Sequence, residues 1–185
     1  MQGNKVAITA CQTVKTNIAW QYTMSEKKLF KVVITAIVRK DEKYLILKRS
    51  PHERKFPSRW TVPGGKLTTE DYIHLAKDTP NYWYNVLERT LRREVKEEAG
   101  IEIENIRYVT SLADAREDDD PSLVISCLAD WAGGEVALEE GMTEYRWVTP
   151  EESRKVDLIE GIYDELIMAD AMARGGGRGE WGKTG

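Results

Sequence analysis

The segment that ends at Gly100 constrains the fold of this 185-residue chain more than any other. Four apolar residues recur there at every fourth position, the spacing of one buried stripe on an α-helix: Leu87, Leu91, Val95 and Ala99. We expect the helix to begin at Thr79-Pro80, as N-cap and first helical residue, and to end at Ala99 with Gly100 as C-cap. A helix with one apolar stripe must pack that stripe on an apolar surface, which the rest of the chain has to supply.

That surface is predicted to be a β-sheet. The β-branched run Val32–Val38 is typical of a strand buried on both faces, and Tyr44–Lys48 pairs back onto it after a turn. Further strands are expected at 60–62, 101–113, 122–131, 135–138 and 144–148. A short helix is expected to start at 149–152, and an amphipathic helix is expected at 158–172. This mixture predicts the α/β class, with a mixed sheet covered by helices on both faces.

The predicted domain occupies residues 29–173. Residues 1–28 have weak periodicity, so we expect a loosely ordered extension, with a strand over 5–10 as the alternative. Residues 174–185 are rich in glycine and are expected to form a flexible tail. No secretory signal is recognisable, and no stretch approaches the ~20 apolar residues of a membrane span, so we expect a cytoplasmic protein with no membrane partner.

The charge and the metal-ligating residues limit the partners. Lys and Arg number 27 against 31 Asp and Glu, a formal net charge of −4, which argues against broad electrostatic binding of DNA. A small nucleotide-type substrate is compatible with this charge, because one bound metal can override the mean field. With two Cys and two His in the chain, the ligands of any metal should be carboxylates. Oxygen ligands indicate a hard ion, Mg²⁺ or alternatively Mn²⁺.

The predicted helix carries such carboxylates. At about 100° per residue, Glu94, Glu97 and Glu98 fall within an arc of about 100°, and two of them overlap the edge of the buried stripe. Like charges this close repel one another, and partial burial raises the cost of ionising them. A bound cation would neutralise the group. The alternative is an ordinary charged helix surface, where neighbouring Arg and Lys form exposed ion pairs.

The same residues carry a family resemblance. The segment from Arg93 to Ile101 resembles the second half of the Nudix box: Arg-Glu, an aliphatic, any residue, Glu-Glu, any residue, Gly, an aliphatic. Pro63-Gly64-Gly65-Lys66-Leu67 resembles the loop that opens the box, and the resemblance extends over roughly residues 32–168. It implies a Nudix-like α/β/α sandwich and Mg²⁺-dependent hydrolysis of a diphosphate linkage. The substrate would be a nucleoside triphosphate or a nucleoside diphosphate derivative, with release of a nucleoside monophosphate.

The resemblance also implies site residues. Catalytic roles fall on Arg93, Glu94 and Glu97, and metal binding falls on Glu94, Glu97, Glu98 and a backbone carbonyl of Gly64 or Gly65. The box departs from the family pattern through an insertion at about residues 72–85. Counting forward from the two glycines of the opening loop puts the first acidic position of the box on Glu70 or Asp71, and counting back from the Arg-Glu pair puts it on Asn85.

Several further residues are candidates for the site. Arg49 and Arg54 could contact phosphates, and Glu117 or Glu144 could act as an extra ligand or base, although acidic turns are usually solvated. Trp83, in the aromatic-rich insertion, could stack on a nucleobase. Alternatively, the helix simply begins early and its aromatics bury themselves on the domain or on a second subunit of a homodimer.

Two other functions stay open from the sequence. A Nudix-fold module could bind a nucleotide or ADP-ribose without cleaving it, although such a binder need not keep the complete set of glutamates. Within enzymes, a loose likeness of residues 45–65 to a coenzyme A-directed signature leaves coenzyme A or ADP-ribose pyrophosphatase as a minor alternative.

Overall fold

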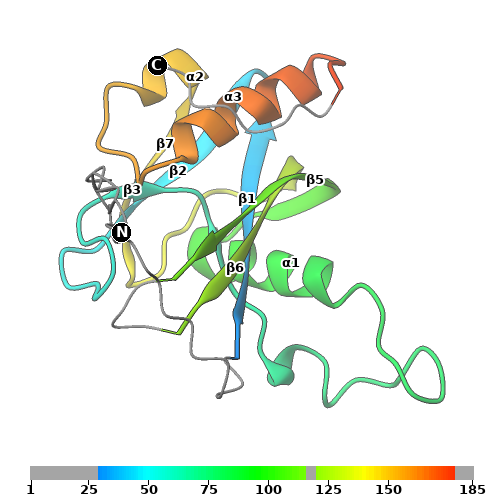
Figure 1. Cartoon of the computed structure of the whole chain (residues 1–185). Coiled ribbons are helices and arrows are strands. Elements are labelled where there is room, and N and C mark those ends of the chain that lie inside the picture. Colours follow the sequence, from blue (N-terminus) through cyan, green and yellow to red (C-terminus); the bar gives the residue numbers. More distant parts are fainter. Residues whose placement is uncertain (1–28, 116–119, 178–185) are drawn as a thin grey trace, which may run out of the picture.

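The computed structural model of the chain describes residues 29–115 and 120–177 (Figure 1). The expectations for residues 1–28, for Glu117 and for the tail beyond residue 177 lie outside these ranges. The elements follow in this order: β1 (Lys31–Lys40), β2 (Lys43–Arg49), β3 (Trp60–Thr61), β4 (Gly64–Lys66), a 3-10 turn η1 (Thr69–Asp71), α1 (Val86–Ala99), β5 (Glu102–Asp114), β6 (Ser122–Gly133), β7 (Met142–Val148), α2 (Pro150–Ser153) and α3 (Ile162–Ala173).

The strands form one mixed sheet with the order β3-β2-β1-β6-β5. β1 and β6 run parallel, and the other pairs are antiparallel. β1 has two different neighbours on its other side, because its end pairs with β2 while Val33–Thr35 pair with β4. β7 extends the sheet beside β2. The short β4 therefore lies at an edge of the sheet, directly beside the middle of β1.

Each face of the sheet carries its own core. Side chains alternate along β1, so Ile34, Ala36 and Val38 pack on one face with the stripe of α1. Ile37 points to the other face, where it packs with Leu166 of α3. Figure 1 shows α1 on one side of the sheet and α2 and α3 on the other. The predicted fold class, a mixed sheet with helices on both faces, is confirmed.

The inserted segment differs from the prediction. α1 begins at Val86, after Asn85 in the left-handed conformation (φ 54°), so the predicted helical start at Pro80 is wrong. Local hydrogen bonds explain the difference: the side chain of Thr79 accepts from the N–H of Tyr82, and that of Asp78 accepts from the N–H of Tyr84. These bonds fold the chain into turns that compete with a helix. The segment extends away from the sheet (Figure 1).

Residues 135–138 also differ, since they form no strand. The N–H of Ala137 donates to the carbonyl of Ala99, and this contact satisfies a backbone acceptor at the end of α1. Within the described part of the chain, no helix is both long enough and apolar enough to cross a bilayer.

Candidate active site

The outer edge of α1 presents acidic side chains to β4. Val95 and Ala99 are fully buried and fix the orientation of the helix against the sheet. Glu98 lies next to this stripe and is itself buried, with 9% of the residue exposed. The Glu94 side chain is 15% exposed, whereas that of Glu97 is 53% exposed. Two of the three predicted acids therefore point toward the protein, and the third lies at its surface.

Two glycines allow β4 to approach these acids closely. The backbone N–H of Gly64 donates to Oε2 of Glu98 at 2.9 Å. A Cβ atom on Gly65 would lie only 2.2 Å from the carboxyl carbon of Glu94. Any side chain at Gly65 would collide with that carboxylate. The Gly-Gly sequence thus brings the backbone of β4 against both Glu94 and Glu98.

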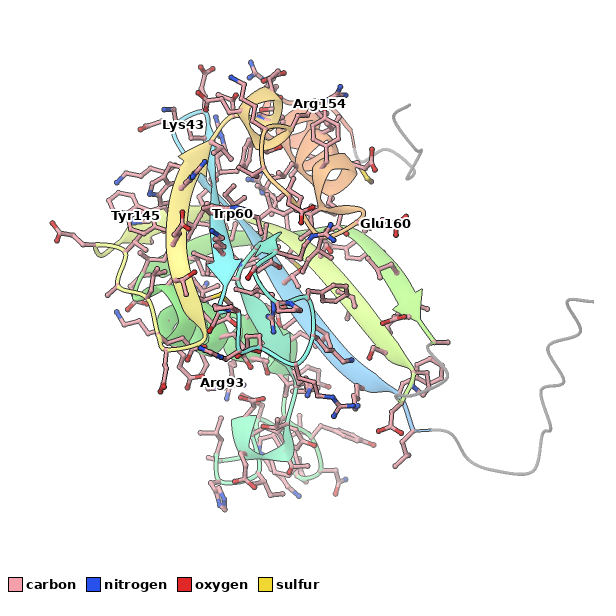
Figure 2. All side chains as sticks on the ribbon, turned by 90° about the vertical axis from the view of Figure 1, so that its left-hand side faces the viewer. Lys43, Trp60, Arg93, Tyr145, Arg154 and Glu160 are labelled. Atoms are coloured by element: carbon pink, nitrogen blue, oxygen red, sulfur yellow. The ribbon has the colours of Figure 1, made fainter. Side chains whose placement is uncertain are left out.

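Arg93 connects the acids of the helix to the loop after β4. Its guanidinium donates to Glu97 (Nη1–Oε2 2.7 Å), to Glu94 (Nη2–Oε1 2.8 Å) and to Asp71 (Nε–Oδ1 2.5 Å). A single arginine therefore sets the positions of three carboxylates. In Figure 2, Arg93 lies where the inserted segment joins the body of the protein.

The contact with Arg93 distinguishes the three candidates for the first acidic position of the box. The side chain of Asp71 is only 3% exposed and also accepts from the N–H of Thr68 at 2.8 Å. Burial opposes its ionisation, but the hydrogen bonds from Arg93 and Thr68 lower the pKa of this carboxyl. Glu70 instead faces solvent beside His74, and Asn85 precedes α1. Asp71 is the residue that the fold places against Arg93.

Burial makes Glu98 an unusual acid. It raises the pKa of the Glu98 carboxyl to about 8; the N–H of Gly64 opposes this shift, and the charges of Glu94 and Glu139 add to it. Burial also raises the pKa of Glu94, although Arg93 offsets part of the effect. No Lys or Arg within the described ranges forms an ion pair with Glu98. The protein therefore holds a half-buried acid next to a buried one, and Arg93, which also binds Asp71 and Glu97, forms an ion pair with Glu94 alone of the two.

Both acids open into a cleft of about 520 Å³. It is lined by Gly64, Gly65, Lys66, Thr68, Glu70, Asp71, Arg93, Glu94 and Glu98. Among residues 29–115 and 120–177, no three acidic, His or Cys side chains converge closely enough to hold an ion alone. Two carboxylates with nearby backbone carbonyls nevertheless fit Mg²⁺, which commonly takes one or two carboxylates and completes its shell with water and phosphate oxygens. Glu97 does not line this cleft, and its role as a metal ligand stays a prediction.

The other predicted site residues are dispersed. Arg49 lies near the cleft, since its charge lowers the pKa of Glu98, but its guanidinium is bound by Glu53 (2.6 Å) and the carbonyl of Lys55 (2.9 Å). Arg54 is exposed. Trp83 packs within the insertion, with its ring 5.2 Å from that of Tyr72.

Glu144 lies on the opposite face of the sheet from α1. It pairs in register with Lys48, two residues beyond Ile46, whose side chain belongs to the α3 core. Its carboxylate binds Lys48 at 2.5 Å, and this hydrogen bond lowers its pKa. The structure therefore does not bring Glu144 together with Glu94 and Glu98.

The sequence analysis missed two acids, Glu139, which contacts Glu98, and Glu53, which lies close to Glu139. The N–H of Glu139 donates to the backbone carbonyl of Glu98 at 3.4 Å. A Cβ on Gly141 would lie within 3.4 Å of carboxylate oxygens of both Glu139 and Glu53. The sequence predicted a separate strand at 135–138 with no contact to α1, so no sequence signal associated Glu139 with the helix.

The fold and the cleft together define an α/β/α sandwich with an acidic site between one helix and a Gly-Gly edge strand. Comparison with protein families identifies the domain, because the family model of the NUDIX domain matches residues 29–168. The chain therefore belongs to the Nudix family of hydrolases, as the sequence resemblance implied. The family acts on nucleoside triphosphates or their derivatives, and the chain is classed with the Nudix pyrophosphohydrolases.

Individual relatives agree with this assignment. The nucleoside triphosphatase NudI of Salmonella agona is 26% identical over 141 residues, which cover 69% of this chain and 88% of that protein. A MutT Nudix hydrolase from Burkholderia pseudomallei has the same fold, with a TM-score of 0.60, 20% identity, and coverage of 75% of this chain and 97% of its own. The Nudix domain of Shewanella oneidensis NrtR, solved with ADP-ribose, gives a TM-score of 0.57 at 17% identity, covering 83% of this chain and 94% of that domain.

Proposed function

We propose that this protein is a Mg²⁺-dependent hydrolase that cleaves a diphosphate linkage of a nucleoside triphosphate or a nucleoside diphosphate derivative, releasing a nucleoside monophosphate. The observation that carries the proposal is the pair formed by the half-buried Glu94 and the buried Glu98, which line one cleft with the glycines of β4. A cation held by these acids would remove their repulsion and would attract the negatively charged phosphates of the substrate. Mn²⁺ could take the same position.

The residues divide the chemistry among them. Glu94 and Glu98 would hold the metal with a carbonyl of Gly64 or Gly65. When bound, the ion supplies charge neutralisation at the phosphates and lowers the pKa of an attacking water. Arg93 orients Glu94 and Glu97 through its hydrogen bonds.

A base is also needed to accept the proton of the attacking water. We propose Glu97 for this role, because its side chain is half exposed and Arg93, which lines the cleft, holds it beside Glu94. Glu139, beside Glu98 on the other side, is the second candidate.

The choice of nucleotide substrate rests on the relatives. NudI is named a nucleoside triphosphatase, and we extend this substrate class to the present chain. A binder without catalysis is the weaker alternative, because pure binding does not require a buried, metal-demanding acid pair. We also propose a cytoplasmic location, where nucleotides and Mg²⁺ are abundant. Homodimer formation stays a prediction.

The test is a panel of nucleoside triphosphates and diphosphate derivatives with and without Mg²⁺, analysed for monophosphate products. The wild type should release a nucleoside monophosphate only with the metal, and Glu98→Gln should abolish this release. Glu102→Gln is the matched control, since Glu102 forms an exposed ion pair with Lys96 just beyond the helix. Absence of turnover on every compound by folded protein, or equal rates in wild type and Glu98→Gln, would contradict the proposal.

A further inference from the structure

Asp71 reaches Arg93 across an interrupted stretch of the chain. The two residues are 22 positions apart, and the insertion at about residues 72–85 lies between them. A longer flexible connection costs more conformational entropy to close, so an unfolded insertion would weaken the ion pair. The side chain of Asp71 is nevertheless only 3% exposed. Arg93 and Thr90, three positions apart on α1, both hydrogen-bond to its carboxylate. The insertion must therefore deliver Asp71 to the helix in a fixed position.

Two aromatic rings form the interior of the insertion. The ring of Trp83 lies 5.2 Å from that of Tyr72, at an interplanar angle of 54°. Both residues are half-buried, whereas the neighbouring Tyr82 and Tyr84 are exposed. Tyr72 directly follows η1, and Trp83 lies three positions before the first residue of α1. This pair of rings therefore joins the two ends of the insertion.

A hydrogen bond adds direction to this ring contact. Nε1 of Trp83 donates to the carbonyl of Leu75 at 3.0 Å. The N–H of Leu75 in turn donates to the carbonyl of Tyr72 at 2.9 Å, and the N–H of Tyr72 donates to that of Thr69 at 3.2 Å. Thr69 is the first residue of η1, and Asp71 is its last. Through its ring and its N–H, one indole therefore holds the turn that carries Asp71.

Polar contacts complete the insertion around this indole. Nζ of Lys77 lies over the ring, 4.7 Å from its centroid, in a cation–π contact. Asp78 forms an ion pair with Arg89 of α1 at 3.8 Å, but the two side chains are 39% and 41% exposed, so this link is weak. Trp83 does not line the acidic cleft. Its contacts lie within the insertion, and the turn that carries Asp71 depends mainly on them.

We propose that Trp83 is a positioning residue for the hydrolysis, which acts by holding Asp71 against Arg93. The same guanidinium donates to Glu94 at 2.8 Å and to Glu97 at 2.7 Å. Without the bond to Asp71, one of the three contacts that fix its direction is lost, and the acids of α1 lose their alignment with it. The insertion thus supplies by packing the contact that it interrupts in the sequence. The inference rests on the proposed function for the reaction that these acids serve.

The insertion provides a matched pair of aromatic residues for the test. Trp83→Leu and Tyr84→Leu each remove one ring from the same segment, and the ring of Tyr84 is exposed. In steady-state hydrolysis of the best nucleotide, Trp83→Leu should lower kcat about tenfold and leave KM within about twofold. Trp83→Phe keeps a ring beside Tyr72 and should lose less, and Tyr84→Leu should change neither constant. A rise in KM that depends on the nucleobase, with kcat unchanged, would overturn the inference, because it would show that the indole stacks on the base.

A double-mutant cycle shows whether Trp83 acts through Asp71. Asp71→Ala removes the carboxylate that binds Arg93 and should lower kcat about tenfold or more. Trp83→Leu should then add no further loss in the double variant, because the contact that it supports is already absent. Losses that multiply in the double variant would show that the two residues act independently, and would overturn the inference.

A spectroscopic readout makes the test independent of turnover. The Nε–H of Arg93, which donates to Asp71 at 2.5 Å, should give a side-chain nuclear magnetic resonance signal protected from exchange with water, identified by its absence in Arg93→Lys. The protection should persist in Tyr84→Leu, fall in Trp83→Phe and disappear in Trp83→Leu. Full protection in folded Trp83→Leu, or in Trp83→Phe where the leucine variant does not fold, overturns the inference. If this pattern is found in a wild type that hydrolyses no nucleotide, the proposed function fails and the role of Trp83 in holding Asp71 stands.

Discussion

Glu98 of α1 and Glu165 of α3 are two buried glutamates on opposite faces of one sheet, and their surroundings differ. Burial raises the pKa of both carboxyls. The cost of burying Glu165 is offset by a hydrogen bond from the Ser126 hydroxyl, and Ser126 in turn accepts a hydrogen bond from the Thr35 hydroxyl on the neighbouring strand. Glu98 receives one backbone N–H and faces the charge of Glu94. Glu165 is therefore satisfied within the protein, whereas Glu98 lacks a positive charge, which a bound cation would supply.

The comparison shows why burial alone does not identify a catalytic acid. A buried carboxyl with neutral donors can serve positioning and packing, because hydrogen bonds meet its needs. A buried carboxyl beside a second one, in a cleft open to ligands, is destabilising until an ion arrives. The following experiments test this difference, from the largest expected effect to the smallest.

The largest effect is expected for turnover in Glu98→Gln. The amide keeps the acceptor for the N–H of Gly64 but loses the charge that would hold the metal, so kcat/KM should fall by about 10³ or more. Steady-state hydrolysis of the best nucleotide at saturating Mg²⁺ provides the measurement, with Glu102→Gln as control. A loss below tenfold would remove Glu98 from the metal site.

The second effect is on stability without metal. The folded pKa of Glu98, about 8, lies above its unfolded value, so the wild type loses stability as pH rises from about 4.5 to 8. Glu98→Gln removes this loss and should stabilise the protein by about 4 kcal/mol at pH 8, with little difference at pH 4.5. Urea unfolding in EDTA at both pH values measures it. A variant less stable than wild type at pH 8 would show that ionised Glu98 does not destabilise the folded protein.

The third effect is on the position of Glu94. Gly65→Ala places a Cβ 2.2–2.4 Å from the atoms of the Glu94 carboxylate, which must then move. Turnover should fall about tenfold or more, since small displacements of metal-binding groups are costly. Gly133→Ala is the matched control, because a Cβ there meets no atom within 4 Å. Equal activity in the two variants would show that Glu94 does not need its present position.

The smallest effect is expected for the stability of Glu165→Gln. Burial raises the pKa of Glu165 as it does that of Glu98, so the pH dependence of stability has the same sign: the wild type loses stability as the pH rises above the pKa that this carboxyl has in the unfolded chain. The bond from Ser126 offsets part of this cost, and the gain from the amide near neutral pH should be about 1 kcal/mol or less. Urea unfolding at pH 8 against pH 4.5 gives the comparison. A gain as large as that of Glu98→Gln would erase the distinction between the two acids.

Much of this architecture could be predicted from the sequence because its signals are local. The β-branched run of β1 and the apolar stripe of α1 before Gly100 give periodicities that the tertiary structure preserved. The same stripe placed Glu94 and Glu98 at the edge of the buried face, where the structure has them.

The remainder depends on contacts between distant segments or on side-chain hydrogen bonds. The start of α1 was wrong because Asp78 and Thr79 bind nearby backbone groups and stop the helix from extending. Asp71 could not be selected from Glu70 or Asn85, since an insertion destroys the counting and only the contact with Arg93 distinguishes them. Glu139 reaches Glu98 only through the fold.

The central claim, that the acids of α1 bind a divalent cation, is tested most directly by titrating the whole protein with Mn²⁺ and measuring free ion by electron paramagnetic resonance. The wild type and Glu102→Gln should bind one Mn²⁺ with equal affinity, and Mg²⁺ should displace it. Glu98→Gln should bind at least about tenfold more weakly. An unchanged affinity in Glu98→Gln, or no binding by the wild type, would contradict the account.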